Sequence, residues 1–238
     1  MSTLNLLYQK RYVINDFISI VIPTVGEIID KEDAYYNLVS VLTAMPIDLM
    51  VQLEDAGIDF MSINEYELFL LMFAGFKDQD TSLIFGDLDL SKFKIAVNEQ
   101  NGNMVLRDEE NDIKIDRAIH SQIAGVLRKI HHLEKNRRKP ANDEAKEVML
   151  KRARDKMKRR KNRKEDSQLE ALIVAMVNTE QYKYDFEGTR ELSIYQFNES
   201  ARQVIKKVDY DNRMYGVYTG SINAKDLSQD DLNWLTHK

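Results

Sequence analysis

The sequence predicts an α+β fold that is mainly α-helical, and three observations support this expectation. The chain of 238 residues contains only nine glycines and three prolines, so few residues favour the tight turns of a fold with many strands. Apolar residues recur at helical spacing over long stretches, and only short strand-like stretches interrupt them. The length is sufficient for a sizeable core, in one domain or in two small ones.

The N-terminal part is expected to contain a strand, a turn and a helix. Residues 12–22 are rich in β-branched and aromatic side chains, which favours a strand. Residues 23–26 begin with Pro23 and end with Gly26, which predicts a turn. An apolar face at helical spacing then predicts a helix over residues 30–43.

Two further helices are expected before residue 80. Pro46 suits the first turn of a helix and Gly57 suits its end, so a helix is predicted over residues 46–56. Ser62 and Glu65 have the spacing of a capping box, in which side chain and backbone satisfy each other's donors. This pattern predicts that an apolar helix begins near residue 64 and extends to residue 76.

A small antiparallel sheet is expected in the middle of the chain. Residues 82–85 look like a short strand. Residues 93–98 and 103–107 flank Gln100-Asn101-Gly102, and Asn-Gly provides the positive φ angles of a tight hairpin. Residues 113–115 are expected to form a third strand.

The second half of the chain predicts helices with recognisable first residues. Asp116 is suited to cap a helix whose apolar residues continue to Leu133, and residues 136–140 break the pattern. Asn142 is suited to cap the next helix, whose thin apolar stripe ends at Met157.

Three shorter predictions complete the chain. Ser167 and Glu170 form a second capping-box pattern before an apolar segment that ends near residue 177. Helical spacing predicts a long helix over residues 192–214, and Ser228 is suited to cap a last short helix.

The charge is distributed unevenly along the chain. Residues 128–164 hold 17 of the 34 lysines and arginines against five acids, a formal charge of +12. Residues 1–127 carry −12 and residues 165–238 carry −5, so the total of −5 hides a basic middle between two acidic flanks. Such a distribution favours an anionic partner or the acidic parts of the same chain.

The charge pattern predicts three parts. Residues 1–135 are expected to form an acidic α+β domain with a hairpin near residues 93–107. Residues 136–166 are expected to form a basic helical connector, and residues 167–238 a helical C-terminal domain. The composition changes within residues 136–166, so the boundary between the two domains is expected there.

The basic helix is the candidate binding site, and three interpretations of it stay open. Residues 151–164 contain ten basic residues and one acid, a composition that cannot pack into a core. The segment is then a solvated or disordered linker, a contact for an acidic protein surface in the same chain or a neighbour, or a contact for nucleic-acid phosphates through residues 146–164. No Phe, Tyr or Trp lies between Phe93 and Tyr182, which disfavours a base-stacking platform for single strands. Arginine suits bidentate contacts with carboxylates or phosphates, so the residues expected to bind a partner are Arg152, Arg154, Arg159, Arg160 and Arg163.

Other classes of function find little support in the sequence. The four histidines have neither the HExxH pattern nor the i, i+4 ligand spacing of a zinc site, so no metal and no cofactor is expected. No nucleophile and base stand in a known catalytic pattern, and an enzyme is not expected. The chain has no cysteine, so no disulfide is expected. It has no recognisable signal peptide and no apolar run of membrane-spanning length, so no membrane partner is expected.

Five short segments stand in a familiar order: Ile22-Pro-Thr-Val-Gly-Glu-Ile-Ile, Pro46-Ile-Asp-Leu-Met-Val-Gln-Leu, Ser193-Ile-Tyr-Gln-Phe-Asn-Glu-Ser, Tyr215-Gly-Val-Tyr-Thr-Gly and Leu232-Asn-Trp-Leu. In texture and order they resemble proteins from the tail-gene region of tailed bacteriophages, which are regarded as tail or baseplate components or as assembly chaperones. The resemblance covers most of the chain and implies no active-site residues.

The resemblance and the charge pattern together predict a non-enzymatic bacteriophage tail or baseplate protein, either a structural component or a chaperone of assembly. Its expected partners are other tail proteins and further copies of itself. Its expected location is the host cytoplasm during assembly, or the tail of the virion. The alternative is an accessory protein that binds nucleic acid through the basic helix.

Overall fold

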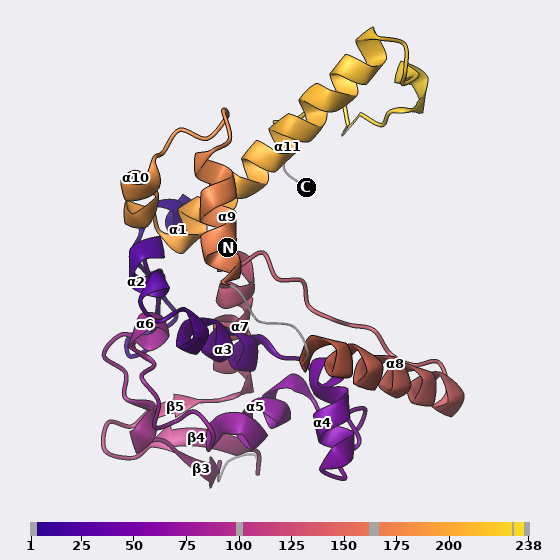
Figure 1. Ribbon diagram of the computed structural model, residues 1–238. Helices are drawn as coiled ribbons and strands as arrows, with labels where there is room; N and C mark the ends of the chain where they lie inside the picture. The colour runs from indigo at the N-terminus through magenta and orange to yellow at the C-terminus, as the bar shows by residue number, and fades with distance from the viewer. Residues whose placement is uncertain (1–3, 99–101, 162–166, 230, 236–238) are drawn as a thin grey trace.

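The computed structural model describes residues 4–98, 102–161, 167–229 and 231–235 (Figure 1). It is 55% helical, with small antiparallel sheets of two and three strands, which confirms the mainly helical α+β fold. The elements follow in this order: α1 Leu4–Tyr8, β1 Arg11–Val13, β2 Ser19–Val21, α2 Val25–Ile29, α3 Glu32–Thr43, η1 Pro46–Leu49, α4 Met50–Asp55, α5 Glu65–Phe73, α6 Ser82–Phe85, η2 Leu90–Lys92, β3 Lys94–Val97, β4 Met104–Asp108, β5 Ile113–Ile115, α7 Arg117–Ile130, α8 Asp143–Lys161, α9 Gln168–Val177, α10 Phe186–Glu191, α11 Ile194–Tyr218 and η3 Ala224–Asp226.

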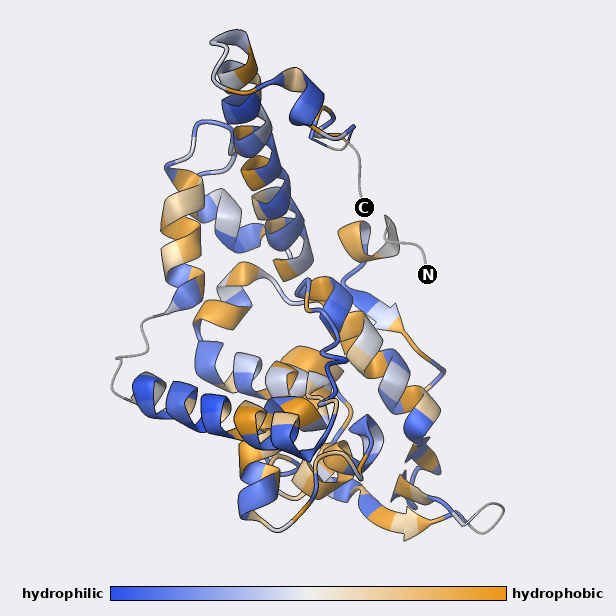
Figure 2. Cartoon of the chain, turned by 90° about the vertical axis from the view of Figure 1, so that its right-hand side faces the viewer, coloured by the Kyte–Doolittle hydropathy of each residue, from blue (hydrophilic) through white to orange (hydrophobic). Residues whose placement is uncertain are grey.

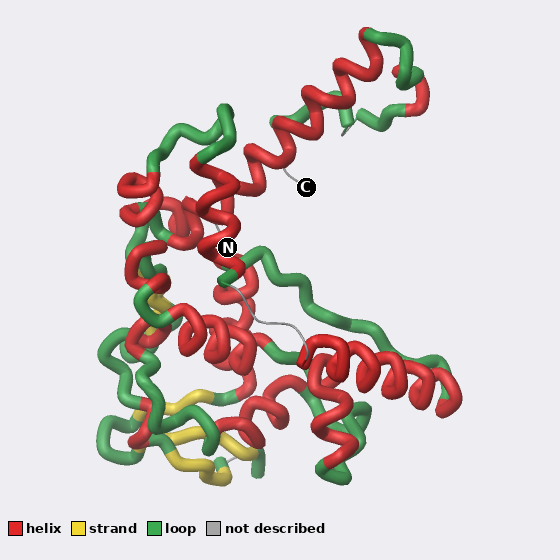
Figure 3. Tube along the Cα trace, viewed as in Figure 1, coloured by secondary structure: helices red, strands yellow, loops and turns green. Residues whose placement is uncertain are grey.

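Two long helices give the molecule its outline. In Figures 1 and 3, the three-stranded sheet lies at one end of the body and α11 extends away from the opposite end. Helix α8 lies beside α4 at the edge of the body, and a long irregular segment connects it to α7. The basic helix is therefore placed on the outside of the molecule.

The predicted strand over residues 12–22 is wrong as a single element, because the structure contains a hairpin there. Strands β1 and β2 pair antiparallel, with Tyr12 opposite Ile20. Between them, the Asn15 side chain accepts hydrogen bonds from the backbone N–H groups of Phe17 and Ile18, at 3.0 and 2.8 Å. An asparagine in such a turn mimics a backbone acceptor, and the continuous apolar composition of the segment concealed it.

The predicted turn over residues 23–26 is also wrong, because α2 begins within it. Thr24 caps α2: its hydroxyl accepts from Glu27 N–H, and the Glu27 carboxylate accepts from Thr24 N–H at 2.7 Å. This reciprocal capping box satisfies two donors that would otherwise be unpaired. It outweighs the turn preference of Pro23 and Gly26, on which the predicted turn depended.

Two local predictions between residues 60 and 86 need correction. The capping box of α5 uses Asn64 and Glu67, two residues later than the predicted Ser62 pattern. Asn64 both accepts from Glu67 N–H and presents its own N–H to the Glu67 carboxylate, at 2.8 Å for the latter bond. Residues 82–85 form one helical turn, α6, and no strand, because the Asp80 carboxylate accepts from Ser82 N–H and starts that turn.

The three-stranded sheet and the helix that follows it agree with the sequence. Strand β4 is central, pairing antiparallel with β3 and with β5, and Leu106 stands opposite both Ile95 and Ile115. The expected turn of this hairpin includes residues 100 and 101, which lie outside the described residues. Asp116 accepts from Ile119 N–H at 2.9 Å and caps α7 as predicted.

One large hydrophobic cluster joins the N-terminal and C-terminal parts of the chain. Helices α9 and α11 contribute to the same cluster as the elements before residue 131, and representative members are Leu6, Ile20, Leu42, Phe69, Leu127, Ile173 and Phe197. Backbone bonds reinforce this union: Val25 N–H donates to the Leu192 carbonyl and Ile194 N–H to the Pro23 carbonyl, both at 2.8 Å. The division into residues 1–135, 136–166 and 167–238 stays a prediction. The large hydrophobic cluster contains residues from the first and the last of these parts.

Helix α11 is longer than predicted, and it begins at a capping box. Ser193 caps it, and the helix continues to Tyr218. Ser228 and Asp231 bond to each other, but the described residues around them form turns and no final helix. The segment after α11 folds back onto this helix: the side chain of Gln203 in α11 donates a hydrogen bond to the Trp234 carbonyl at 3.1 Å.

A second, smaller hydrophobic cluster lies between α4, α5 and α8. It contains Leu150 as its single buried residue from α8, and its other buried members are Ile47, Val51, Leu53, Phe60 and Leu68. Met149 and Ala153 pack against it from α8. The basic helix is thus fixed to the body by one apolar contact region.

Candidate partner-binding helix

Helix α8 begins as the sequence predicts. The Asn142 side chain accepts from Ala145 N–H at 2.8 Å, and Asp143 and Glu144 occupy the first turn. Acidic residues at this end of a helix interact favourably with its dipole. The 19 residues of α8 span about 28 Å at 1.5 Å per residue.

The N-terminal half of α8 is docked through a narrow apolar stripe. Leu150 is only 6% exposed, and Met149 and Ala153 pack beside it against the same cluster. In contrast, Val148 is 48% exposed and Met157 is 37% exposed. The apolar contact therefore ends at Ala153, one turn before Met157, where the sequence predicted that the stripe ends.

Near the N-terminus of α8, beside this apolar stripe, Lys146 forms ion pairs with acidic residues at the end of α4 and just after it. Lys146 Nζ lies 2.9 Å from Asp59 Oδ1 and 3.8 Å from a Glu54 oxygen, and it stands over the Phe60 ring. A backbone N–H of Met61 and the Lys146 ammonium hold the pKa of Asp59 below its usual value. The same hydrogen bond to Asp59 raises the pKa of Lys146, so both groups stay charged at neutral pH.

A second ion pair lies two turns further along α8. Arg154 Nη2 lies 2.6 Å from Asp55 Oδ1, and the two side chains are 44% and 62% exposed. Pairs this exposed add little stability, because water competes for both charges. The pair instead orients α8 along α4, with the acidic end of α4 against the basic helix.

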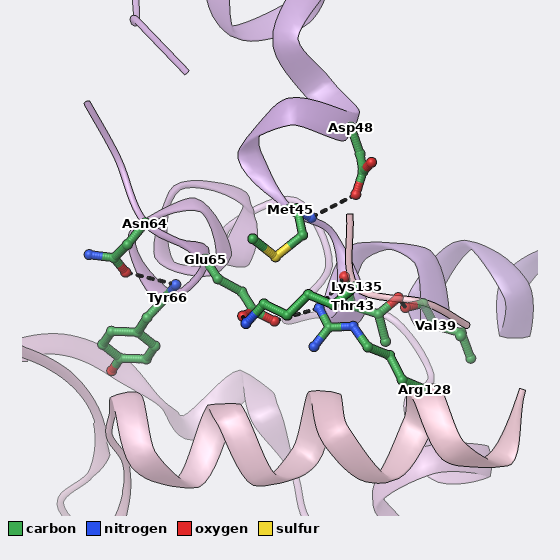
Figure 4. A network of polar contacts seen from close by, with 9 residues as sticks. All are labelled: Val39, Thr43, Met45, Asp48, Asn64, Glu65, Tyr66, Arg128 and Lys135. Carbon is green, nitrogen blue, oxygen red and sulfur yellow. Dashed lines mark hydrogen bonds and ion pairs between the residues drawn. The ribbon is translucent and has the colours of Figure 1, made fainter. Parts of the chain in front are cut away.

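The segment before α8 is anchored by a buried carboxylate, Glu65. Arg128 Nη2 of α7 donates to Glu65 Oε1, and Lys135 Nζ donates to Glu65 Oε2, both at 2.5 Å (Figure 4). The Arg128 and Glu65 side chains are both only 11% exposed. Burial alone raises the pKa of Glu65, but the hydrogen bonds from Lys135 and Arg128 outweigh it and lower the pKa below its usual value.

Two further bonds complete this anchor. Arg128 also donates to the Thr43 carbonyl at 2.6 Å, which ties α7 to the end of α3. Asn136 donates to the Asp48 carboxylate at 2.8 Å. The route from α7 to α8 is thus fixed at residues 135 and 136, although it contains no regular secondary structure.

The outward side of α8 carries cations that the body does not neutralise. Arg152, Lys156 and Arg159 are exposed and fall within about 60° of one another on the helix, and Lys151 and Lys158 are exposed next to them. Within the described ranges, no ion pair forms to any of these five side chains. Figure 2 shows the C-terminal turns of α8 mostly in the hydrophilic colour. We call Arg152, Lys156 and Arg159 the outer stripe.

The structure separates the five arginines that the sequence proposed as partner-binding. Arg152 and Arg159 are exposed on the outer stripe, whereas Arg154 binds Asp55 of the same chain. Arg160 belongs to α8, but its side chain is not described, and Arg163 lies outside the described residues. Lys156 was missed as a member of the stripe, although its position four residues after Arg152 predicts a shared face.

The acids that receive α8 were not predicted from the sequence either. Glu54, Asp55 and Asp59 form a short acidic run at the end of α4 and just after it. The acidic run is opposite in charge to the cations at positions 146 and 154, but a single sequence does not show which acid binds which cation. Their separation of 87 residues in one case and 99 in the other explains the omission.

The histidines lie in different surroundings. The His131 ring shares a hydrogen bond of 2.9 Å with the Tyr35 hydroxyl, whereas His120 stacks on Phe69 with 4.4 Å between ring centroids. Burial lowers the pKa of both rings to about 4, so both are neutral at pH 7. Among the described residues, no three His, Asp or Glu side chains are placed to hold a metal ion.

The helices in the described ranges do not combine the length and the apolar character needed to cross a membrane. Comparisons of the whole chain with family models, curated proteins and solved structures found no match. The function proposed for the chain therefore rests on its own sequence, including the resemblance described above, and on the contacts of its residues.

Proposed function

We propose that this chain is a non-enzymatic protein of a bacteriophage tail or baseplate, a structural component or an assembly chaperone, which acts through protein–protein contacts. The observation that supports the proposal best is the division of α8. Its first half is docked on the body by Leu150 and by ion pairs, while the outer stripe carries unpaired cations into solvent. A helix that is docked through one side and carries unpaired cations on another can bind a partner while it stays in contact with the rest of the chain.

The contacts inside the chain indicate what kind of partner fits. Lys146 and Arg154 bind carboxylates at the end of α4 and just after it, so α8 already recognises an acidic helix end. The outer stripe presents the same chemistry on an exposed side of the helix. An acidic surface on another tail protein, or on another copy of this chain, would complement it. Such complementarity determines the orientation of assembly more than its affinity.

Nucleic-acid binding is the second candidate, since phosphates would also complement the outer stripe. Against it stands the absence of aromatic side chains on α8, which leaves no ring to stack on a base. Any such binding would therefore depend on the phosphate backbone and weaken steeply with salt.

Co-expression tests the proposal. The chain is produced together with the products of the genes adjacent to its own, and complexes are separated by size-exclusion chromatography. The test variant carries Arg152→Glu, Lys156→Glu and Arg159→Glu. A control with the same change of charge carries Lys94→Glu, Lys114→Glu and Lys183→Glu, which are exposed and distant from α8 in sequence. The proposal predicts that the complex is lost in the test variant and kept in the control. A complex that survives in both would contradict it.

A salt titration with a 30-base-pair DNA duplex separates the two candidates. Fluorescence anisotropy of the labelled duplex should show no binding at physiological salt if the partner is a protein. Binding that persists there, falls with a steep salt dependence and is lost in the outer-stripe variant would favour nucleic acid instead.

A further inference from the structure

A cavity of about 350 Å³ lies beneath the segment that leads from α7 to α8. Four stretches contribute to its wall, within residues 45–47, 60–66, 117–121 and 135–139. Its volume is at the lower end of the range of about 300–1,000 Å³ that small-ligand sites occupy. The anchor at Glu65 and Asn136 holds one side of this cavity in place.

The charges around the cavity are almost entirely positive. Glu65 is the one acid among the described residues of its wall, and Arg128 and Lys135 occupy both oxygens of that carboxylate. Within the described ranges, the remaining cations of the wall form no ion pair, and these are Arg117, Arg137, Arg138 and Lys139. All four residues are exposed, so they stand where an incoming anion would meet them first.

A buried polar atom in the same wall lacks a partner. His120 is 2% exposed, and its Nε2 is the one buried side-chain nitrogen or oxygen in the described part of the chain without a hydrogen bond. Stacking on Phe69 holds the ring in place, with centroids 4.4 Å apart. Buried polar groups are almost always hydrogen-bonded, so this atom of a cavity-lining residue is available to a backbone amide of a peptide occupant.

The rest of the wall indicates that the anion belongs to a larger apolar molecule. Met45, Met61 and Ile63 line the cavity, and methionine adapts its shape to different apolar groups. The two aromatic rings of the wall are buried, Phe60 at 2% and Tyr66 at 6% exposure. Neither can therefore stack on a nucleotide base, which disfavours a nucleotide as the occupant.

We propose that this cavity binds an acidic peptide segment of a protein partner, with a carboxylate at the cationic rim and a neighbouring apolar side chain inside. The inference rests on the proposed function, because it assigns the peptide to the partner that the outer stripe binds. The two sites are adjacent along the chain: the rim ends at Lys139, and α8 begins at Asp143. One acidic partner surface can therefore engage both.

Methyl NMR of the full-length protein tests the proposal. The methionine methyl groups are labelled with ¹³C, so Met45 and Met61 report on the cavity and Met176, in the large hydrophobic cluster, serves as an internal control. The probes are acetyl-Glu-Leu-Glu-Leu-amide, its neutral counterpart acetyl-Gln-Leu-Gln-Leu-amide, adenosine monophosphate and inorganic phosphate. We expect the acidic peptide to shift Met45 and Met61 at submillimolar concentration, and the other probes to bind at least about tenfold more weakly.

Two pairs of variants locate the binding. Ser121→Trp places a large ring in the cavity from an exposed position, and its control Gln122→Trp adds the same ring on the neighbouring residue, outside the wall. We expect Ser121→Trp to abolish the shifts and Gln122→Trp to keep them. Replacing the rim residues Arg137, Arg138 and Lys139 by Gln should weaken the peptide by about tenfold at low salt, because each exposed ion pair contributes little by itself.

The outer-stripe variant separates this proposal from the proposed function. Arg152, Lys156 and Arg159 lie outside the cavity wall, so their replacement should leave peptide binding unchanged. Peptide binding without any complex of tail proteins would contradict the proposed function and keep the cavity site. The cavity site is overturned if the acidic peptide shifts neither methionine, if phosphate or adenosine monophosphate binds as well as the peptide, or if Ser121→Trp binds normally.

Discussion

Helices α7 and α8 are neighbours in sequence but are held in the molecule in opposite ways. In α7, six residues are buried, and they include Ile123, Val126 and Leu127, all fully buried. Among the described side chains of α8, Leu150 is the single buried one, and its other contacts are the packing of Met149 and Ala153 and the ion pairs to α4 and to the segment after it. The difference teaches that helical periodicity alone does not determine whether a helix is structural. A helix whose apolar stripe stops early leaves the rest of its surface for a partner.

The largest effect should come from the core of α7. Leu127→Ala removes a fully buried side chain from the large cluster and should lower the free energy of unfolding by about 3 kcal/mol. Urea denaturation followed by circular dichroism measures it. A loss below about 1 kcal/mol would mean that α7 is not the central support that its burial implies.

The buried anchor between the two helices should come next. Glu65→Gln leaves Arg128 buried without its ion pair and should cost about 2–3 kcal/mol of unfolding free energy. The pKa of Glu65 lies below its ordinary 4.5 in the folded state, so its contribution is full above about pH 5. That contribution is lost as the pH falls through the lowered pKa. The gap between the wild type and Glu65→Gln should therefore narrow in acid, and a constant gap between pH 7 and pH 3 would contradict this assignment.

A smaller and more local effect is expected from the apolar contact of α8. Leu150→Ala should cost about 2 kcal/mol, and the loss should appear mainly as undocking of α8. Hydrogen exchange detected by mass spectrometry should show faster exchange in residues 143–154 and unchanged exchange in α7. Faster exchange throughout both helices would show that α8 supports the whole fold.

The smallest effects should come from single cations on α8. Arg154→Gln breaks an exposed ion pair with Asp55 and should cost about 0.5 kcal/mol. Arg152→Gln removes an unpaired cation and should change the unfolding free energy by less than that. Equal urea midpoints for Arg152→Gln and the wild type, with a slightly lower midpoint for Arg154→Gln, would confirm the division of α8.

Much of the fold could be predicted because its signals are local. Asp116 caps α7, Asn142 caps α8, and strands β3 and β4 pair antiparallel as the sequence predicts. The misplaced elements reflect competition between local signals. At Thr24, a capping box prevails over the turn preference of its neighbours, and at Ser82 a hydrogen bond to the Asp80 carboxylate accompanies a helical turn in place of the predicted strand.

The candidate site could be predicted only in part, because its division depends on long-range contacts. The sequence identified α8 and its cations, but nothing local distinguishes Arg154 from Arg152. The partner of Arg154 is Asp55, 99 residues away, and Lys146 meets Asp59 over 87 residues. The cavity wall likewise combines four separate stretches, so neither its cations nor His120 stood out as a group.

Hydrogen exchange of α8 in the free protein and in the complex with the co-expressed tail protein tests the division of this helix most directly. In the free protein, residues 146–154 should exchange about tenfold more slowly than residues 155–161, because the apolar and ionic contacts described for α8 lie in the former. In the complex, residues 155–161 should slow to match them. Equal exchange of the two halves in the free protein, or a complex that leaves residues 155–161 unchanged, would contradict the claim that residues 146–154 dock α8 and that the outer stripe, which continues to Arg159, binds a partner.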